Sequence, residues 1–265
     1  MTRRTWITIL IAAAIVAGGS FALYVHFRAL TMSDALRLYG GNARVRLAPH
    51  FRRAGVAYPP KRIALLAFKK EMRLALWAGD AKSWHFIRAY PILAASGHAG
   101  PKLRQGDYQV PEGLYRIEYL NPASSYHLSM KVGYPNAFDR AQAFRDRRAN
   151  LGGDIFIHGK NVSIGCIAIG DPGIEELFTL AEDVGTQNIK VIIAPNDLRV
   201  AGPPMREDSP LWIAGLYRTI AAALMEFPVW MESNSAFDVR GLSKTGRPGF
   251  SPAAESGLFA MRGLR

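Results

Sequence analysis

Short apolar runs follow one another closely through the first half of the chain, and polar or glycine-bearing turns separate them. Residues 63–68, 72–77 and 84–90 each form such a run, with Lys69–Glu71 and Gly79–Asp80 between them. Apolar runs of this length and spacing are typical of β-strands joined by tight turns. The pattern therefore predicts an antiparallel meander near the start of a folded domain.

More strands are predicted after a Gly/Pro-bearing connection at residues 97–107. Residues 110–119 predict a turn that feeds a strand. Residues 126–132 alternate between apolar and polar side chains, which places His127 on the polar face of a strand. A polar loop at 133–150 then leads to apolar segments at 154–159, 166–169 and 189–194. We therefore expect a mainly β fold.

Two segments carry helical patterns instead. Asp171 as N-cap and Pro172 at the first helical position predict the start of one helix, and Gly185 its end. A second helix is predicted by an apolar stripe that recurs every four residues at Trp212, Leu216, Ile220 and Leu224. Its polar face carries little charge, so we expect it to pack on the domain rather than on a membrane.

The N-terminus predicts export. Trp6–Phe27 runs for about 22 residues without a charged side chain, which is the length that a helix needs to cross a bilayer. Arg3 and Arg4 on the short flank predict that this end stays in the cytoplasm. The apolar run continues past Gly18–Ser20, so a signal anchor is favoured over a cleaved signal. We expect an inner-membrane anchor with the domain in the periplasm; secretion to the periplasm after cleavage is the alternative.

These features divide the chain into five parts. We expect a signal anchor at 1–27, a basic spacer at 28–60 with a short helix from Ser33, the main domain at 61–195, a C-terminal helical extension at 196–232, and a disordered tail at 233–265 rich in Gly, Ser, Pro and Arg.

The net charge of +12, from 33 basic and 21 acidic residues, suggests an anionic partner. Nucleic acid, an anionic envelope component, or simply a basic host proteome would each account for it. Export argues against nucleic acid, because the bulk of the chain would then lie outside the cytoplasm.

Cys166 is the only cysteine of the chain, so it has no disulfide partner within it. His158 precedes it by eight positions, and Ser163 and Gly165 lie directly before it. A cysteine nucleophile needs a nearby base, and histidine suits this role near neutral pH. Two adjacent strands joined by a loop of this length would bring the two side chains together. A small buried hydrophobic cysteine is the plain alternative.

The backbone before the cysteine suggests an oxyanion site. Gly165 allows a bend through which its N–H and that of Cys166 can point at one spot, where a tetrahedral intermediate would carry its negative oxygen. A zinc site fails on ligand count, because the chain offers one cysteine and no second His or Cys at short spacing. We expect no metal and no cofactor.

These residues resemble a known family. His158-Gly159, a short loop and Ser163-x-Gly165-Cys166 are similar to the catalytic motif of the L,D-transpeptidase (YkuD-type) domain. Upstream, Gly106 and Pro111-x-Gly113-x-Tyr115-x-Ile117 resemble the second family motif, with Val110 in place of threonine. The resemblance spans roughly Lys61 to Pro195.

Within that family the chain is most similar to the YafK-like subgroup. The segments that carry this similarity are Gly100–Asp107, Leu120–Pro122, Tyr126–Leu128 and Gly133–Arg140. The family at large usually has an arginine two positions after the nucleophile, whereas this chain has Ala168, as the subgroup does. The subgroup is associated with cutting the bond between peptidoglycan and the outer-membrane lipoprotein.

The resemblance implies a β sandwich or barrel with one or two packed helices, and an acyl-transfer reaction. Cys166 would attack the carbonyl of a diaminopimelate residue in a peptidoglycan stem peptide, and His158 would protonate the leaving amine. The Gly159 carbonyl would orient the imidazole, and Ser163 would hydrogen-bond within the site loop. An amine or water would then accept the acyl group; the sequence leaves this choice open.

Six residues are candidate substrate contacts on placement and charge: Lys102, Arg104, His127, Tyr134, Asn136 and Arg140. Each also has a plain reading as a solvated charge, a surface histidine or part of a proline turn. Two other functions compete with the enzyme: a non-catalytic peptidoglycan-binding protein that keeps the fold, and a thiol redox sensor.

Overall fold

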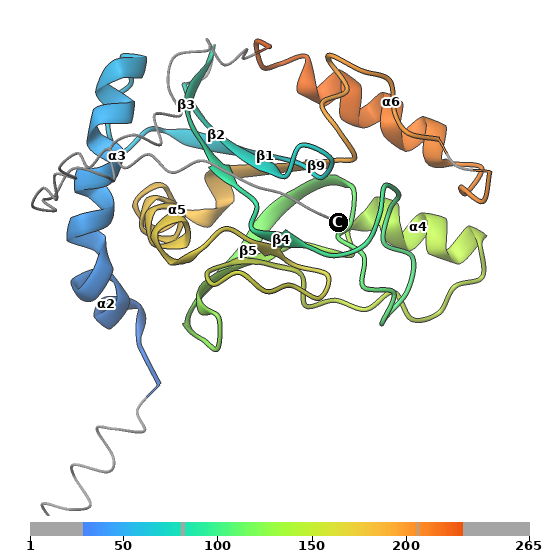
Figure 1. The fold of residues 1–265 in the computed structure, drawn as a ribbon, viewed down its shortest axis with the longest axis horizontal. Helices are drawn as coiled ribbons and strands as arrows, with labels where there is room; N and C mark the ends of the chain where they lie inside the picture. The colour runs from blue at the N-terminus through green and yellow to red at the C-terminus, as the bar shows by residue number, and fades with distance from the viewer. Residues whose placement is uncertain (1–28, 81–82, 206, 230–265) are drawn as a thin grey trace, which may run out of the picture. The chain divides into compact units, whose positions relative to one another are not determined.

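The computed structural model describes residues 29–80, 83–205 and 207–229, and in these a nine-stranded sheet organises the chain (Figure 1). The strand order is β3-β2-β1-β9-β5-β6-β7-β8-β4. The strands are β1 (Arg62–Phe68), β2 (Arg73–Gly79), β3 (Trp84–Pro91), β4 (Ala94–Ala95), β5 (Gly113–Ser124), β6 (His127–Val132), β7 (Phe156–His158), β8 (Ile167–Ala168) and β9 (Ile189–Ala194).

The predicted meander is confirmed. β1 pairs antiparallel with β2, and β2 with β3, with bounds within two residues of those expected. Six of the seven residues of β1 and of β2 are buried, which explains why these strands read as continuous apolar runs rather than alternating ones. β9 adds parallel to β1 and carries the sheet toward β5.

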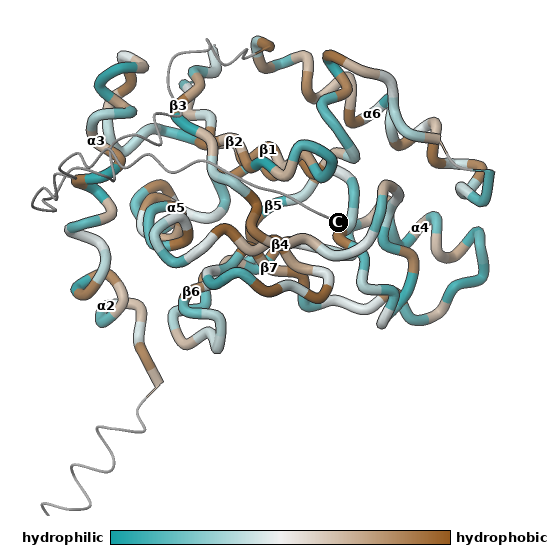
Figure 2. Tube along the Cα trace, viewed as in Figure 1, coloured by the Kyte–Doolittle hydropathy of each residue, from teal (hydrophilic) through white to brown (hydrophobic). Residues whose placement is uncertain are grey.

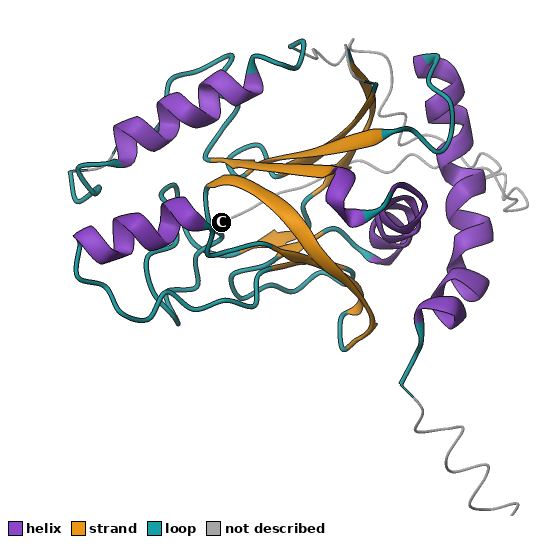
Figure 3. Cartoon of the chain, turned by 180° about the vertical axis from the view of Figure 1, so that it is seen from behind, coloured by secondary structure: helices purple, strands orange, loops and turns teal. Residues whose placement is uncertain are grey.

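The long strand β5 joins two halves of the sheet and is the point at which the sheet bends (Figure 3). Its first part, Gly113–Arg116, pairs with β9, and its second part pairs with β6. Register shifts after Ile117 and Asn121 interrupt the second pairing. Bulges of this kind bend a strand and increase its twist, so one strand can serve both halves.

Helix α5 (Asp171–Val184) fills the inside of this bend. Its buried residues include Ile174, Leu177 and Phe178, and they share one core with Ile157 of β7 and Ile167 of β8. Figure 2 shows this as brown, apolar segments along β4, β7 and part of α5. The helix begins one residue earlier than expected: Asp171 is its first residue, and Gly170 rather than Asp171 is the N-cap. A 3₁₀ turn (Thr186–Asn188) follows it.

The segment predicted as a basic spacer is helical and packed. α2 (Met32–Ala35), a π-helical turn (Leu36–Gly40) and α3 (Gly41–Ala54) follow one another, and α3 packs on α5. Buried Ala43, Leu47 and Phe51 lie four residues apart on α3. Two arginines of this segment bind carboxylates of α5: Arg44 binds Asp183, and Arg46 binds Glu175 and Glu176.

Two further helices border the other side of the sheet. α4 (Ala137–Arg145) lies within the segment that we expected to be a polar loop, so the fold has more helix than the one or two elements predicted. α6 (Ile213–Leu224) packs on β9 and β5 through Leu216, Ile220 and Leu224, as its stripe predicted. The predicted extension therefore packs as part of one unit that runs to Val229.

The predicted signal anchor at 1–27 and the predicted tail at 233–265 lie outside the described residues. Among the helices that the structure describes, none combines the length and the apolar character that crossing a bilayer requires.

Glu176 is the buried anchor of the contact between α5 and its neighbours. Its carboxylate accepts hydrogen bonds from Arg46 Nε at 2.8 Å, Arg88 Nη1 at 2.7 Å and the Tyr90 hydroxyl at 3.0 Å, and 3% of its side chain is exposed. α3, β3 and α5 thus meet at one carboxylate.

We predict that Glu176→Ala destabilises the fold by about 3 kcal/mol, because it leaves the Arg88 guanidinium and the buried Tyr90 hydroxyl without their acceptor and removes one of the two carboxylates that bind Arg46. Urea unfolding would measure the loss. Glu182→Ala, on the exposed side of the same helix, is the control and should change stability by less than about 0.5 kcal/mol. Equal effects of the two substitutions would contradict the prediction.

Candidate active site

Strands β7 and β8 lie side by side, with His158 at the end of β7 and Cys166 directly before β8. The two strands are parallel, with Ile157 opposite Ile167 and His158 opposite Ala168. Ile157 and Ile167 point into the core. Since side chains alternate along a strand, His158 and Ala168 point the other way. Cys166 lies in the bend directly before β8, so the pairing brings its segment beside that of His158, and the contact of base and nucleophile stays a prediction.

Ala168 lies directly beside the candidate base. It is the register partner of His158 and is fully buried. An arginine at this position would bring a guanidinium next to the imidazole, whereas alanine leaves this part of the site uncharged.

The imidazole of His158 is held in one orientation. Its Nδ1 lies 2.6 Å from the carbonyl oxygen of Gly159. Because a carbonyl oxygen only accepts, Nδ1 carries the proton and Nε2 keeps its lone pair, free to take a proton from a nucleophile. The ring of Tyr126 covers the imidazole at a centroid distance of 4.7 Å.

Gly159 is required by close approach. A Cβ at this position would lie 2.5 Å from Asp171 Oδ1 and 2.8 Å from the Tyr126 carbonyl oxygen. Asp171 in turn accepts a hydrogen bond from the backbone of Lys160 at 2.7 Å. The start of α5 thus fixes the residue whose carbonyl orients the base.

Ser163 holds the backbone of the nucleophile from both sides. Its Oγ accepts the N–H of Cys166 at 3.0 Å and donates to the Cys166 carbonyl at 2.6 Å. This closes a turn in which Gly165 has a φ of +93°, a conformation that favours glycine. Ser163 thus hydrogen-bonds within the loop of the site, whereas the oxyanion role of Gly165 stays a prediction.

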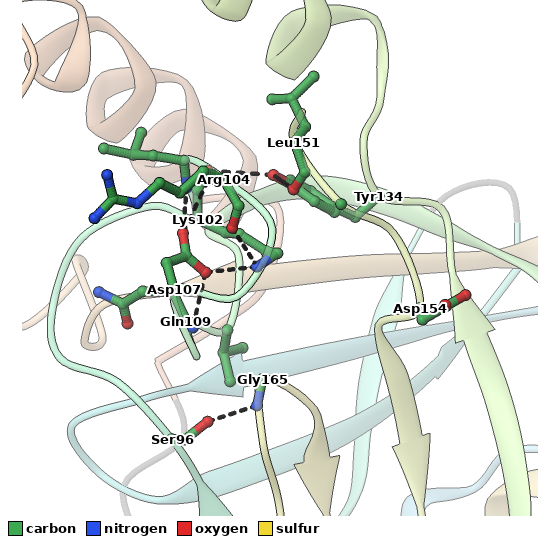
Figure 4. Close-up of polar contacts among 12 residues, drawn as sticks. Ser96, Lys102, Arg104, Asp107, Gln109, Tyr134, Leu151, Asp154 and Gly165 are labelled. Atoms are coloured by element: carbon green, nitrogen blue, oxygen red, sulfur yellow. Dashed lines mark hydrogen bonds and ion pairs between the residues drawn. The ribbon is translucent and has the colours of Figure 1, made fainter. Parts of the chain in front are cut away.

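Both backbone N–H groups expected to form an oxyanion site are occupied in this structure. Gly165 donates its N–H to the hydroxyl of Ser96, a contact drawn in Figure 4, and Cys166 donates its N–H to Ser163. Ser96 follows β4, which pairs antiparallel with β8 beside the nucleophile. An incoming oxyanion would have to replace at least one serine hydroxyl.

The electrostatics favour a neutral pair in the resting site. Burial raises the pKa of the Cys166 thiol above its ordinary value, and the backbone of Phe156 only partly offsets this. Burial also lowers the pKa of the His158 imidazole, against the effect of the Gly159 carbonyl. The thiol points toward the carbonyl oxygen of Asp154, with a sulfur–oxygen distance of 3.5 Å. Near neutral pH the site therefore holds a thiol and a neutral imidazole.

The predicted contacts Lys102 and Arg104 lie in the loop before β5. Lys102 is buried and binds Asp107, whose carboxylate also accepts backbone N–H groups of Leu103, Arg104 and Gln109 (Figure 4). Lys102 therefore holds the loop together rather than pointing into solvent. Arg104 is exposed and lines a cleft of about 760 Å³ that includes neither Cys166 nor His158.

The other four candidates are also placed away from the nucleophile or used by the fold. The buried Tyr134 hydroxyl donates to the carbonyls of Lys102 and Leu151. Asn136 caps α4 through reciprocal hydrogen bonds with Asp139. His127 contacts Glu175 at 3.0 Å. Arg140 is exposed on α4, and its groove contains neither catalytic candidate.

Sequence reasoning missed Ser96, Tyr126 and Gln109 as parts of the site region. Ser96 binds the Gly165 backbone, Tyr126 covers His158, and a Cβ on Gly165 would lie 3.6 Å from the Gln109 carbonyl oxygen. No local pattern marks these residues, because each reaches the site through pairing of segments distant in sequence. Within residues 29–80, 83–205 and 207–229, no cluster of His, Cys, Asp or Glu is arranged to hold a metal ion.

Comparison with known proteins confirms the resemblance. Residues 62–193 match the model of the L,D-transpeptidase catalytic domain (YkuD), close to the span expected from the motifs. YafK of Escherichia coli strain K12 is 38% identical over 133 residues, which cover 48% of this chain and 52% of YafK. YafK of Escherichia coli O157:H7 gives the same values. The chain spans about half the length of the curated relatives it matches.

Solved structures show more distant likenesses. The helical cell shape determining protein Pgp2 from Campylobacter jejuni is 22% identical, with 53% of this chain and 50% of that chain covered and a TM-score of 0.43. L,D-transpeptidase 1 from Mycobacterium tuberculosis is 15% identical, with 50% of this chain and 62% of that chain covered and a TM-score of 0.29.

We predict that alkylation of Cys166 by iodoacetamide speeds up by about tenfold per pH unit, with no plateau below pH 9, because only the thiolate reacts and the thiol pKa is raised. Mass spectrometry of the intact chain would measure the rate, and Cys166→Ser should remain unlabelled. A plateau near neutral pH would instead indicate a preformed thiolate–imidazolium pair.

A second prediction concerns Asp139, the partner of Asn136. Burial raises the pKa of its carboxyl to about 6, so the folded state favours the protonated form. The free energy of unfolding of the wild type, relative to that of Asp139→Asn, should therefore be highest below about pH 4. It should fall by on the order of 2–3 kcal/mol as the pH rises through about 6. Guanidinium unfolding of both proteins at several pH values tests this; parallel pH profiles would contradict it.

Proposed function

Residues 62–193 form a domain of the L,D-transpeptidase catalytic (YkuD) family, and on this premise we propose that the chain is a cysteine enzyme that acts on peptidoglycan stem peptides. The observations that carry the proposal are the parallel pairing of β7 with β8, which begins directly after Cys166, and the contact with the Gly159 carbonyl that leaves Nε2 of His158 as the free base. The acylated substrate group is the diaminopimelate residue that the family resemblance implies.

The reaction proceeds in two halves. Cys166 Sγ attacks the carbonyl carbon of the diaminopimelate residue while His158 Nε2 takes the thiol proton. The tetrahedral intermediate then collapses, the carbon–nitrogen bond breaks, and the leaving amine takes that proton from His158. A thioester remains on Cys166. An amine or water attacks it in the second half and restores the thiol.

The neutral resting pair fits this sequence. With the thiol pKa raised and the imidazole pKa lowered, proton transfer is coupled to the attack rather than completed before it. The N–H groups of Gly165 and Cys166 are the donors available to the developing oxyanion, once the substrate oxygen displaces a serine hydroxyl.

Ala168 bears on the choice of acceptor. The position beside His158 carries no charge, in contrast to the arginine that the family usually has there. This departure supports release of a wall-bound partner, such as an outer-membrane lipoprotein, over formation of new crosslinks. Residues 6–27 support a setting in the periplasm, anchored to the inner membrane.

We predict that Cys166→Ala abolishes all change to peptidoglycan and that His158→Ala slows it by about 100-fold or more, because attack then lacks its base. The assay is digestion of purified peptidoglycan, with and without attached lipoprotein, followed by mass spectrometry of the products. His85→Ala, an exposed histidine on β3, should retain full activity.

The products also separate the alternatives. Loss of lipoprotein without new crosslinks supports hydrolytic release, whereas new crosslinks support transpeptidation. Continued activity of Cys166→Ala would overturn the proposed nucleophile. If the wild type binds peptidoglycan but yields no product and no Cys166 adduct with a carbapenem, the chain is a binding module. Reversible oxidation of Cys166 without turnover would favour the redox sensor.

A further inference from the structure

A second groove, of about 690 Å³, lies on the side of the sheet that α4 and α6 border (Figure 1). We call it the basic groove, because its four cationic side chains outnumber its two carboxylates. The cationic residues are Arg62, Arg116, Arg140 and Lys190, and the carboxylates are Glu118 and Glu226. Neither Cys166 nor His158 is part of it, so what it binds is independent of the proposed reaction.

Strand register forces three of these cations together. Arg116 of β5 lies directly opposite Lys190 of β9. Lys190 is also the register partner of Ala64 in β1, and Arg62 lies two residues before Ala64 on the same face. Like charges opposite one another on neighbouring strands are destabilising. The adjacent strands β1, β9 and β5 thus bring three cationic side chains close together, and repulsion between them lowers the stability of the fold.

The two carboxylates of the groove compensate this repulsion only at Lys190. Glu226 is engaged by Lys190, whose Nζ reaches both carboxylate oxygens at 2.9 and 2.7 Å. Glu118 is about half exposed, and the ion pair that it makes is with Lys131 at 3.9 Å. Among the described residues, then, neither acid pairs with an arginine of the groove.

The arginines remain available to a ligand. Arg62 stacks over the ring of Trp84 at 4.1 Å, and its buried Nε has no hydrogen-bond partner among the described residues. Arg116 donates one long bond, of 3.3 Å, to the Gln187 carbonyl. Arg140 is exposed, and none of the hydrogen bonds or ion pairs of the described residues involves its side chain. Most guanidinium donors are therefore unused.

We propose that the basic groove binds a phosphate group, either of a soluble phosphate ester or of an anionic lipid headgroup. Guanidiniums remain charged at all physiological pH values, and their planar N–H pairs match phosphate oxygens. The volume suits a small ligand or headgroup. The chain's own residues 230–265 are a poorer occupant, because they carry five basic and three acidic side chains.

The test is binding of inorganic phosphate and glycerol 3-phosphate to the full chain, measured by calorimetry, with acetate as a competitor that should bind more weakly. We expect saturable binding that Arg116→Gln/Arg140→Gln weakens by about tenfold or more. Arg145→Gln/Arg218→Gln is the matched control. It removes the same charge from exposed positions of α4 and α6 outside the groove and should leave binding unchanged.

A second arm identifies the source of the phosphate. Groove-dependent binding to vesicles of phosphatidylglycerol, but not of phosphatidylcholine, assigns the site to a lipid headgroup; binding of the soluble phosphates alone assigns it to a soluble ester. Equal losses in the two double variants would show a net-charge effect and overturn the proposal, as would the absence of saturable binding to either probe. Peptidoglycan activity should be unchanged in both variants, so this test and that of the proposed function fail separately.

Discussion

The parallel pairing of β7 with β8 is the constraint on which the site depends. It sets His158 and Ala168 on one face and Ile157 and Ile167 on the other, directly after Cys166, so the same register builds the core and positions the base. A slip by one residue would exchange the two faces and turn the imidazole into the core in place of isoleucine. Both strands are short, but β6 and β4 flank them and fix their position from either side.

Burial of the site also determines the protonation states of the thiol and the imidazole before substrate binds. Removal from water disfavours both the thiolate and the imidazolium, so it raises the thiol pKa and lowers the imidazole pKa. Ser96 and Ser163 meanwhile satisfy the N–H groups that a tetrahedral intermediate would need. The N–H groups of the site are thus hydrogen-bonded in the absence of substrate. When a substrate carbonyl enters, attack by the thiol is coupled to proton transfer, and the carbonyl oxygen displaces a serine hydroxyl.

Sequence patterns predicted what depends on neighbouring residues and missed what depends on distant ones. Apolar runs located β1, β2 and β3, and the spacing of His158 and Cys166 predicted two adjacent strands, which are β7 and β8. The packing of α3 was missed because its arginines read as solvated, whereas their partners lie on α5, far along the chain. Asn136 was read as a substrate contact for a different reason: its capping partner Asp139 is only three residues away, but weak amphipathicity hides the helix that the two residues begin.

The fold divides the basic side chains between two settings. Arg44, Arg46 and Arg199 each form an ion pair with an acidic side chain. In the basic groove Arg116 lies opposite Lys190, and the four cationic side chains of the groove outnumber its two carboxylates. Composition treats these arginines alike, although the first group contributes to stability and the second costs it. A cost of this kind on three adjacent strands is what a site for an anion would impose on an otherwise apolar sheet.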